Sequence, residues 1–225
     1  MRQCESCFKN FVRPIEISHL SAYMYEPPPF PVLRQILVAA NFYKCHLYAK
    51  QAQRAILVLF PDEPNKVALY NLSFIVEATK LGRIHTGLQG LLRCTFYHLA
   101  RKTFKREAGD PDYDGERLES LPGSELVILL ELQRQLASSW DGISTILQAN
   151  CACNPKCSRQ PLSATTRNIY LFDPIHGINK VIKQDWISNG FCVFCMNDAT
   201  SKLKKERTKI WDNVQTLVTP PRTES

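Results

Sequence analysis

Two stretches of helical periodicity meet at a short corner between Ala39 and Ala49. Apolar residues recur at three- and four-residue steps on both sides of this corner, first at Leu33, Ile36, Leu37 and Ala40, and then at Tyr48, Ala52, Ala55, Ile56 and Leu59. This spacing gathers apolar side chains on one face of an α-helix. The sequence therefore predicts a packed hairpin of two amphipathic helices, and a mainly α fold.

Proline-containing breaks separate this hairpin from its neighbours. The tract of residues 26–31 contains four prolines, which cannot continue a helix, so an opening helix with Ile17, Leu20 and Met24 on one face is expected to end before it. Residues 61–65 form the second break, where Asn65 is the expected cap of the next helix. Gly82 is expected to separate that helix from one carrying Leu88, Leu91, Leu92, Thr95 and Leu99.

The second half begins with a long helix and ends in a cysteine-rich region. After a polar loop over 105–123, Ser124 opens a helix whose wide apolar face comprises Leu129, Leu132, Leu136, Trp140 and Ile143. Of these, Trp140 and Leu136 are expected to anchor the core. Beyond residue 150 the pattern predicts a short strand at 168–172 and a helix at 202–218. The expected organisation is a partial domain at 1–60, a helical extension at 61–149, a cysteine-bearing α+β subdomain at 150–218 and a frayed tail at 219–225.

Composition limits the class of protein. With 225 residues and 44% hydrophobic content the chain can bury a core, and its net charge of +7 fits an ordinary globular protein while leaving anionic partners open. The longest apolar run ends at Pro61 after six residues, and the polar N-terminus lacks the apolar segment of a signal peptide. We therefore expect an intracellular protein, nuclear or cytoplasmic, with no membrane partner.

Cysteines are the candidates for site chemistry. There are nine, and in a reducing compartment they serve as free thiols, core residues or metal ligands. Cys192 and Cys195 have the C-x-x-C spacing of a zinc knuckle, and Cys153 and Cys157 can supply the other pair, with Cys151 as the alternative to one of them. Four thiolates would saturate one zinc ion, so the site would be structural. A packed thiol cluster and redox chemistry remain the other interpretations.

Nothing in the sequence predicts a catalytic residue or an organic cofactor. The chain has no G-x-S-x-G elbow, phosphate-binding glycine loop, dinucleotide fingerprint or H-E-x-x-H motif, so a non-enzymatic protein is expected. The Cys4-x-x-Cys7 pair is expected to fray at the terminus. The last helix is expected to bury Leu203, Ile210 and Trp211. A basic run is expected to form its solvated face, with nucleic-acid contact as the second interpretation: Lys202, Lys204, Lys205, Arg207 and Lys209.

The corner and several later segments resemble BTB/POZ-domain proteins of mushroom-forming fungi. Ala39, Phe42 and Leu47 match the family's turn A-x-x-[FY]-x-x-x-x-L. Further segments lie in the family's order, 20–25 before this turn and the others after it: 65–70, 94–101, 140–143, Asp173–Pro174, Gly190–Cys195 and Glu206–Asp212. The resemblance implies the helical end of a BTB/POZ domain. The strands and helices that open such a domain have no room before Ile15, so we expect homodimers only if a longer product supplies them.

The resemblance implies a protein–protein interaction module that binds a protein partner through an apolar helical surface. A zinc-stabilised nucleic-acid-binding module using the lysine-rich helix is the alternative. The third interpretation is a defective gene product without a function of its own.

Overall fold

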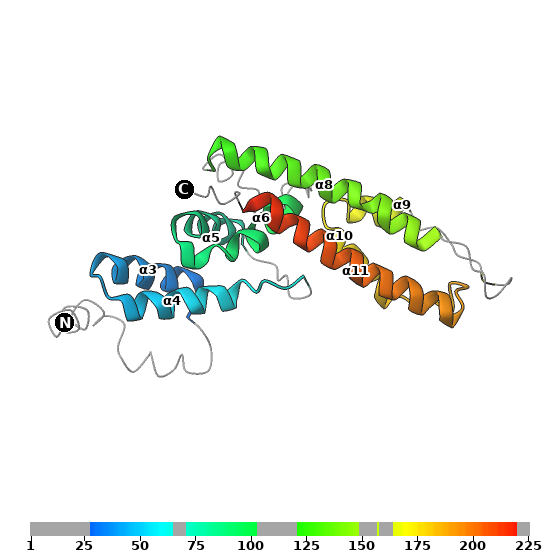
Figure 1. Ribbon diagram of the computed structural model, residues 1–225, viewed down its shortest axis with the longest axis horizontal. Helices are drawn as coiled ribbons and strands as arrows, with labels where there is room; N and C mark the ends of the chain where they lie inside the picture. Colours follow the sequence, from blue (N-terminus) through cyan, green and yellow to red (C-terminus); the bar gives the residue numbers. More distant parts are fainter. Residues whose placement is uncertain (1–27, 65–70, 103–120, 149–156, 158–163, 220–225) are drawn as a thin grey trace.

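The structure is a computed structural model that describes residues 28–64, 71–102, 121–148, 157 and 164–219. Its regular elements are α3 (Phe30–Phe42), α4 (His46–Leu59), α5 (Leu72–Ile84), the 3-10 turn η1 (Thr86–Leu88), α6 (Leu91–Lys102), α8 (Gly123–Gln148), α9 (Ala164–Ile169), α10 (Pro174–Lys183) and α11 (Val193–Val218). These residues contain no strand. The α3–α4 hairpin lies at one end, and α8 and α11 extend toward the other (Figure 1).

The predicted hairpin is confirmed. A three-residue corner joins α3 to α4, and Lys44 takes a positive φ of 55° there. Leu37, Ala40 and Ile56 are fully buried between the helices, as their spacing predicted. The predicted opening helix before Pro27 lies outside the described residues.

Aromatic and ionic contacts join the hairpin to α5. The ring of Phe30 packs edge-on against Phe60 with centroids 5.4 Å apart, and lies 5.7 Å from the ring of Phe74. Arg34 on α3 pairs with Glu77 on α5 at 3.0 Å. Packing at the start of α3 therefore attaches the hairpin to the rest of the molecule.

Gly82 is not a helix boundary, because it lies inside α5 and is buried. A Cβ atom there would come 2.9 Å from Leu92 Cδ2, so glycine permits α5 and α6 to pack closely. The side chain of Asn71 caps α5 by accepting a hydrogen bond from Ser73 N–H at 2.9 Å. The predicted cap, Asn65, lies outside the described residues.

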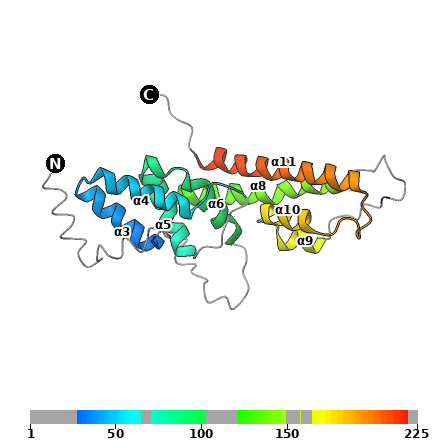
Figure 2. The same cartoon turned by 90° about the horizontal axis from the view of Figure 1, so that it is seen from below.

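Two long antiparallel helices, α8 and α11, form the second half, and α10 packs against both (Figure 2). Trp140 and Leu136 on α8 are buried, which confirms their predicted place in the core. The Trp140 indole N–H points at the carbonyls of Tyr170 and Leu171, at 3.0 and 3.2 Å. The final helix starts at Val193, nine residues before the predicted start at Lys202.

The predicted strand at 168–172 is wrong, and the C-terminal region is helical rather than α+β in its described part. Residues 164–169 form α9, and a turn follows through Phe172. Asp173 then caps α10 by accepting a hydrogen bond from His176 N–H, and Pro174 occupies the first helical turn. Residues 170–172 therefore form a turn against Trp140 rather than pairing with another strand.

Candidate metal centre

Three cysteine sulfurs meet at the start of α11. The Sγ atoms of Cys157, Cys192 and Cys195 all lie within 4.8 Å of one another. Cys157 comes from a position 35 residues before Cys192. The structure therefore brings together three of the four predicted ligands, while Cys153 and its alternative Cys151 lie outside the described residues.

A tight turn after α10 directs the chain into this cluster. The Asp185 carboxylate accepts hydrogen bonds from the N–H and hydroxyl of Ser188, at 3.1 and 2.6 Å, and they lower the pKa of Asp185. Gly190 supplies a positive φ of 83°. Trp186 and Phe191 pack edge-to-face beneath the turn, with centroids 4.7 Å apart. These contacts hold the chain just before Cys192.

Backbone N–H groups and the helix start favour negative charge on the sulfurs. Cys192 is the N-cap of α11, and its Sγ accepts from Cys195 N–H at 3.5 Å. The Cys157 Sγ accepts from Cys192 N–H at 3.3 Å. The positive end of the helix dipole lies at the same place. These donors orient two sulfurs in the way that outer-shell groups orient metal ligands.

The geometry and donor set suit zinc. Around a tetrahedral ion with bonds of about 2.3 Å, neighbouring sulfurs lie about 3.8 Å apart, so small side-chain movements would close the cluster on an ion. Cys195 is buried and the other two thiols are half-buried. Soft thiolates select zinc over magnesium or calcium. A fourth thiolate would close the site to substrate and make it structural rather than catalytic.

Two other described cysteines serve packing. Cys45 and Cys94 are buried away from the cluster. Burial raises the pKa of Cys94 to about 12, with a smaller effect from the Asp62 carboxylate. Cys94 therefore remains a neutral thiol in the folded protein.

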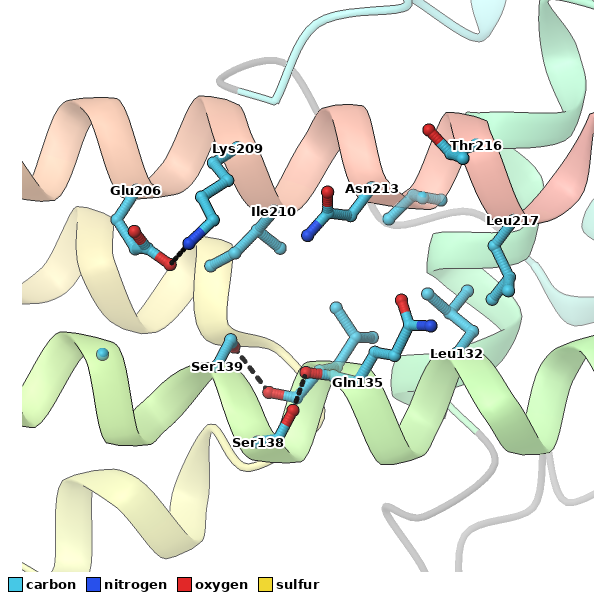
Figure 3. Close-up of a pocket in the computed structure, with 13 residues that line it drawn as sticks. Leu132, Gln135, Ser138, Ser139, Glu206, Lys209, Ile210, Asn213, Thr216 and Leu217 are labelled. Carbon is cyan, nitrogen blue, oxygen red and sulfur yellow. Dashed lines mark hydrogen bonds and ion pairs between the residues drawn. The ribbon is translucent and has the colours of Figure 1, made fainter.

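A groove of about 570 Å³ runs between α8 and α11, a feature that sequence reasoning missed (Figure 3). Its lining includes the buried side chains of Leu136 and Ile210 and the polar side chain of Asn213. At one end, Lys209 pairs with Glu206 at 3.6 Å. Among the described residues, its lining contains no histidine or cysteine and does contain Ser138, Ser139 and Glu206. Only the pairing of two helices distant in sequence creates it.

The lysine-rich helix divides into exposed and inward-facing residues. Lys202, Lys204, Lys205 and Lys209 are exposed. Arg207 instead turns toward α10, where its NH1 donates to Asn179 Oδ1 at 2.6 Å and desolvation lowers its pKa. Leu203, Ile210 and Trp211 form the buried side, as predicted.

Comparisons with protein-family models, curated proteins and solved structures find no match. Within its described part the chain has no helix long and apolar enough to cross a lipid bilayer.

Proposed function

We propose that this chain is a non-enzymatic protein–protein interaction module of the BTB/POZ type. The observation that carries the proposal is a group of exposed apolar side chains at the corner of the α3–α4 hairpin. Phe42 is 77% exposed, Leu47 66% and Val38 55%. An exposed aromatic residue beside aliphatic neighbours is typical of a protein-binding surface.

These side chains face away from the hairpin's own core. Val38 and Phe42 are four residues apart and share one side of α3, while Leu37 and Ala40 on the other side are buried. The Phe42 ring packs edge-on against Tyr43 with centroids 5.0 Å apart, which restricts its motion before binding. We infer that the partner presents an apolar pocket or helix face to Phe42.

The test compares Phe42→Asp with the control Lys50→Asp on the same hairpin. Both positions are exposed, so neither change should alter the helical circular dichroism or the unfolding midpoint. Cross-linking in cells and quantitative mass spectrometry would identify a protein enriched with wild type and the control. Calorimetry with that purified partner should show about 30-fold weaker binding for Phe42→Asp, as for an aromatic hot spot. Equal affinity for the two variants would overturn the proposal.

We further propose that the thiol cluster holds one structural zinc ion. Its role would be to tie residue 157 to the start of α11. Because Cys157 and Cys192 lie 35 positions apart in the sequence, a shared ion would cross-link two segments that the chain itself joins only through a long connection.

A second candidate function is a zinc-stabilised nucleic-acid-binding module. The observation in its favour is the four exposed lysines of α11, which follow the thiol cluster along the helix. However, Lys202 pairs with Asp198 at 2.8 Å and Lys209 pairs with Glu206, which reduces the charge available to phosphates. Fluorescence anisotropy with duplex and single-stranded oligonucleotides at 50 and 200 mM salt would test it. Binding that weakens steeply with salt and is lost in Lys204→Glu/Lys205→Glu would support this candidate.

A further inference from the structure

We propose that Cys192 and Cys195 form a reversible oxidation site, which closes to a disulfide when the cluster meets a hydroperoxide and thereby releases the metal ion. The metal-release step rests on the zinc centre proposed above. The disulfide step rests on the arrangement of the thiols themselves.

The geometry favours bonding between these two sulfurs. They lie within 4.8 Å on the first turn of one helix, so the sulfurs need to approach by at most about 2.8 Å to reach disulfide distance. The Cys195 N–H already donates to the Cys192 Sγ. Cys157 Sγ lies within the same 4.8 Å, so the shared helical turn rather than distance favours Cys192 with Cys195, whereas a bond to Cys157 would join positions 35 residues apart.

Exposure gives the two sulfurs different roles. Cys192 is half-buried, and its neighbours Val193 and Phe194 are exposed, whereas Cys195 is buried. A small hydroperoxide therefore reaches Cys192 before Cys195. Its thiolate attacks one peroxide oxygen, the O–O bond breaks, and Cys192 becomes a sulfenic acid. The Cys195 thiolate then attacks that sulfur, forming the S–S bond and expelling hydroxide.

One molecule of hydrogen peroxide accepts the two electrons that disulfide formation releases. Two thiolates lose two electrons, and hydrogen peroxide, taking two protons from solvent, becomes two water molecules. With Cys192 and Cys195 joined in a disulfide, only Cys157 and one further ligand would hold a bound zinc ion, so it would be held far more weakly and released. A dithiol reductant reverses the bond and regenerates both ligands.

The experiment titrates the full zinc-loaded chain with hydrogen peroxide in the absence of oxygen. A chromogenic chelator measures free zinc, and peptide mapping by mass spectrometry locates disulfides. We expect one zinc released per Cys192–Cys195 disulfide, and recovery of both after adding dithiothreitol and zinc. A main product that contains Cys157, or zinc release without any disulfide, would overturn the proposal.

Two variants test the roles assigned to the sulfurs. In Cys157→Ser/Cys195→Ser, oxidation should stop at a Cys192 sulfenic acid that dimedone traps, because neither neighbouring thiol is left to resolve it. In Cys94→Ala, which lacks a buried thiol outside the cluster, disulfide yield should equal that of wild type. Dimedone labelling of Cys195 rather than Cys192 in the peroxide-treated wild-type chain would reverse the assigned order and overturn the proposal.

A zinc-free sample separates this inference from the metal centre. If native mass spectrometry finds no metal and peroxide still links Cys192 to Cys195, the zinc centre fails while the oxidation site is supported. If one zinc binds and ten equivalents of peroxide neither release it nor form the bond, the oxidation site fails while the metal centre stands.

Discussion

The guanidinium of Arg83 on α5 meets the carboxylate of Glu125 on α8 in a two-point ion pair. The Nε–Oε1 distance is 2.7 Å and the NH2–Oε2 distance is 2.9 Å. The third nitrogen of the guanidinium, NH1, donates to the carbonyl of Val218 at the end of α11, at 2.7 Å. The same guanidinium lies 5.3 Å from the ring centre of Phe96 on α6. One side chain of α5 thus contacts three further helices, α6, α8 and α11, at their common junction.

Breaking this pair is expected to destabilise the fold. Glu125→Gln leaves the Arg83 charge, which is 23% exposed, without its carboxylate partner, and should lower the free energy of unfolding by about 2 to 3 kcal/mol. Urea unfolding would measure the change. Glu131→Gln is the control, because it removes a surface pair with Arg134 on the same helix and should have little effect. Equal effects for the two variants would contradict the junction's importance.

A pair of glycine substitutions should act in opposite directions. In Gly177→Ala the added Cβ would lie 2.5 Å from the buried Trp140 ring, so we expect a loss of about 1 to 3 kcal/mol. In Gly142→Ala the nearest atom is Glu206 Oε1 at 3.5 Å, so the exposed mid-helix position should gain about 0.5 to 1 kcal/mol. Thermal unfolding would measure both, and a neutral Gly177→Ala would disprove the close approach to Trp140.

Removing the Trp140 side chain should lower the free energy of unfolding more than either glycine substitution changes it. Trp140→Ala removes a fully buried side chain and its hydrogen bonds to two carbonyls, and is expected to destabilise the protein by about 3 to 5 kcal/mol. A loss below about 1 kcal/mol in a reversible urea titration would place the indole at the surface.

Alkaline pH should weaken the fold through buried neutral groups. Burial raises the pKa of Cys94 from 9.0 to about 12, and burial and Asp173 raise the pKa of Tyr97 well above 10.0. Both groups ionise earlier in the unfolded chain, so stability is fully present below pH 9 and falls above it, by up to about 1.4 kcal/mol per pH unit for each group. Urea unfolding at pH 8, 9 and 10 should show a shallower fall for Cys94→Ala than for wild type. If the free energy of unfolding falls equally with pH in wild type and Cys94→Ala, the raised pKa of Cys94 would be contradicted.

Metal removal should act locally. Native mass spectrometry of protein produced with zinc is expected to show one bound ion, and a chelator should speed amide exchange in α9, α10 and the first turn of α11 while α5 and α6 stay protected. Zinc binding to isolated peptides is worth about 10 to 16 kcal/mol, so the ion should survive gentle purification. A metal-free mass and unchanged exchange after chelation would leave the three cysteines as packing residues.

The α3–α4 hairpin should open before the rest of the molecule. Its two helices pack mainly on each other, and few contacts such as Arg34–Glu77 and Phe30–Phe74 reach α5. Amides in α3 and α4 should therefore exchange faster than those of α8. Equal protection of the hairpin and α8 would show that the two unfold as one unit.

The sequence by itself determined the helices and their buried faces, because apolar spacing of three and four residues acts within a single element. Leu37, Ile56, Trp140 and Leu203 were all found by that spacing, and all are buried. The C-x-x-C spacing likewise identified Cys192 and Cys195, since both lie on one turn.

Only the tertiary structure decided features that join distant segments. The run before Asp173 became a turn rather than a strand because the indole of Trp140 bonds to its carbonyls. Gly82 proved to be a contact point because α6 packs on it. The place of Cys157 beside α11, the Arg83 junction and the groove between α8 and α11 each depend on the approach of separate helices. Local periodicity carries no information about such distances, which are set by how buried surfaces fit together.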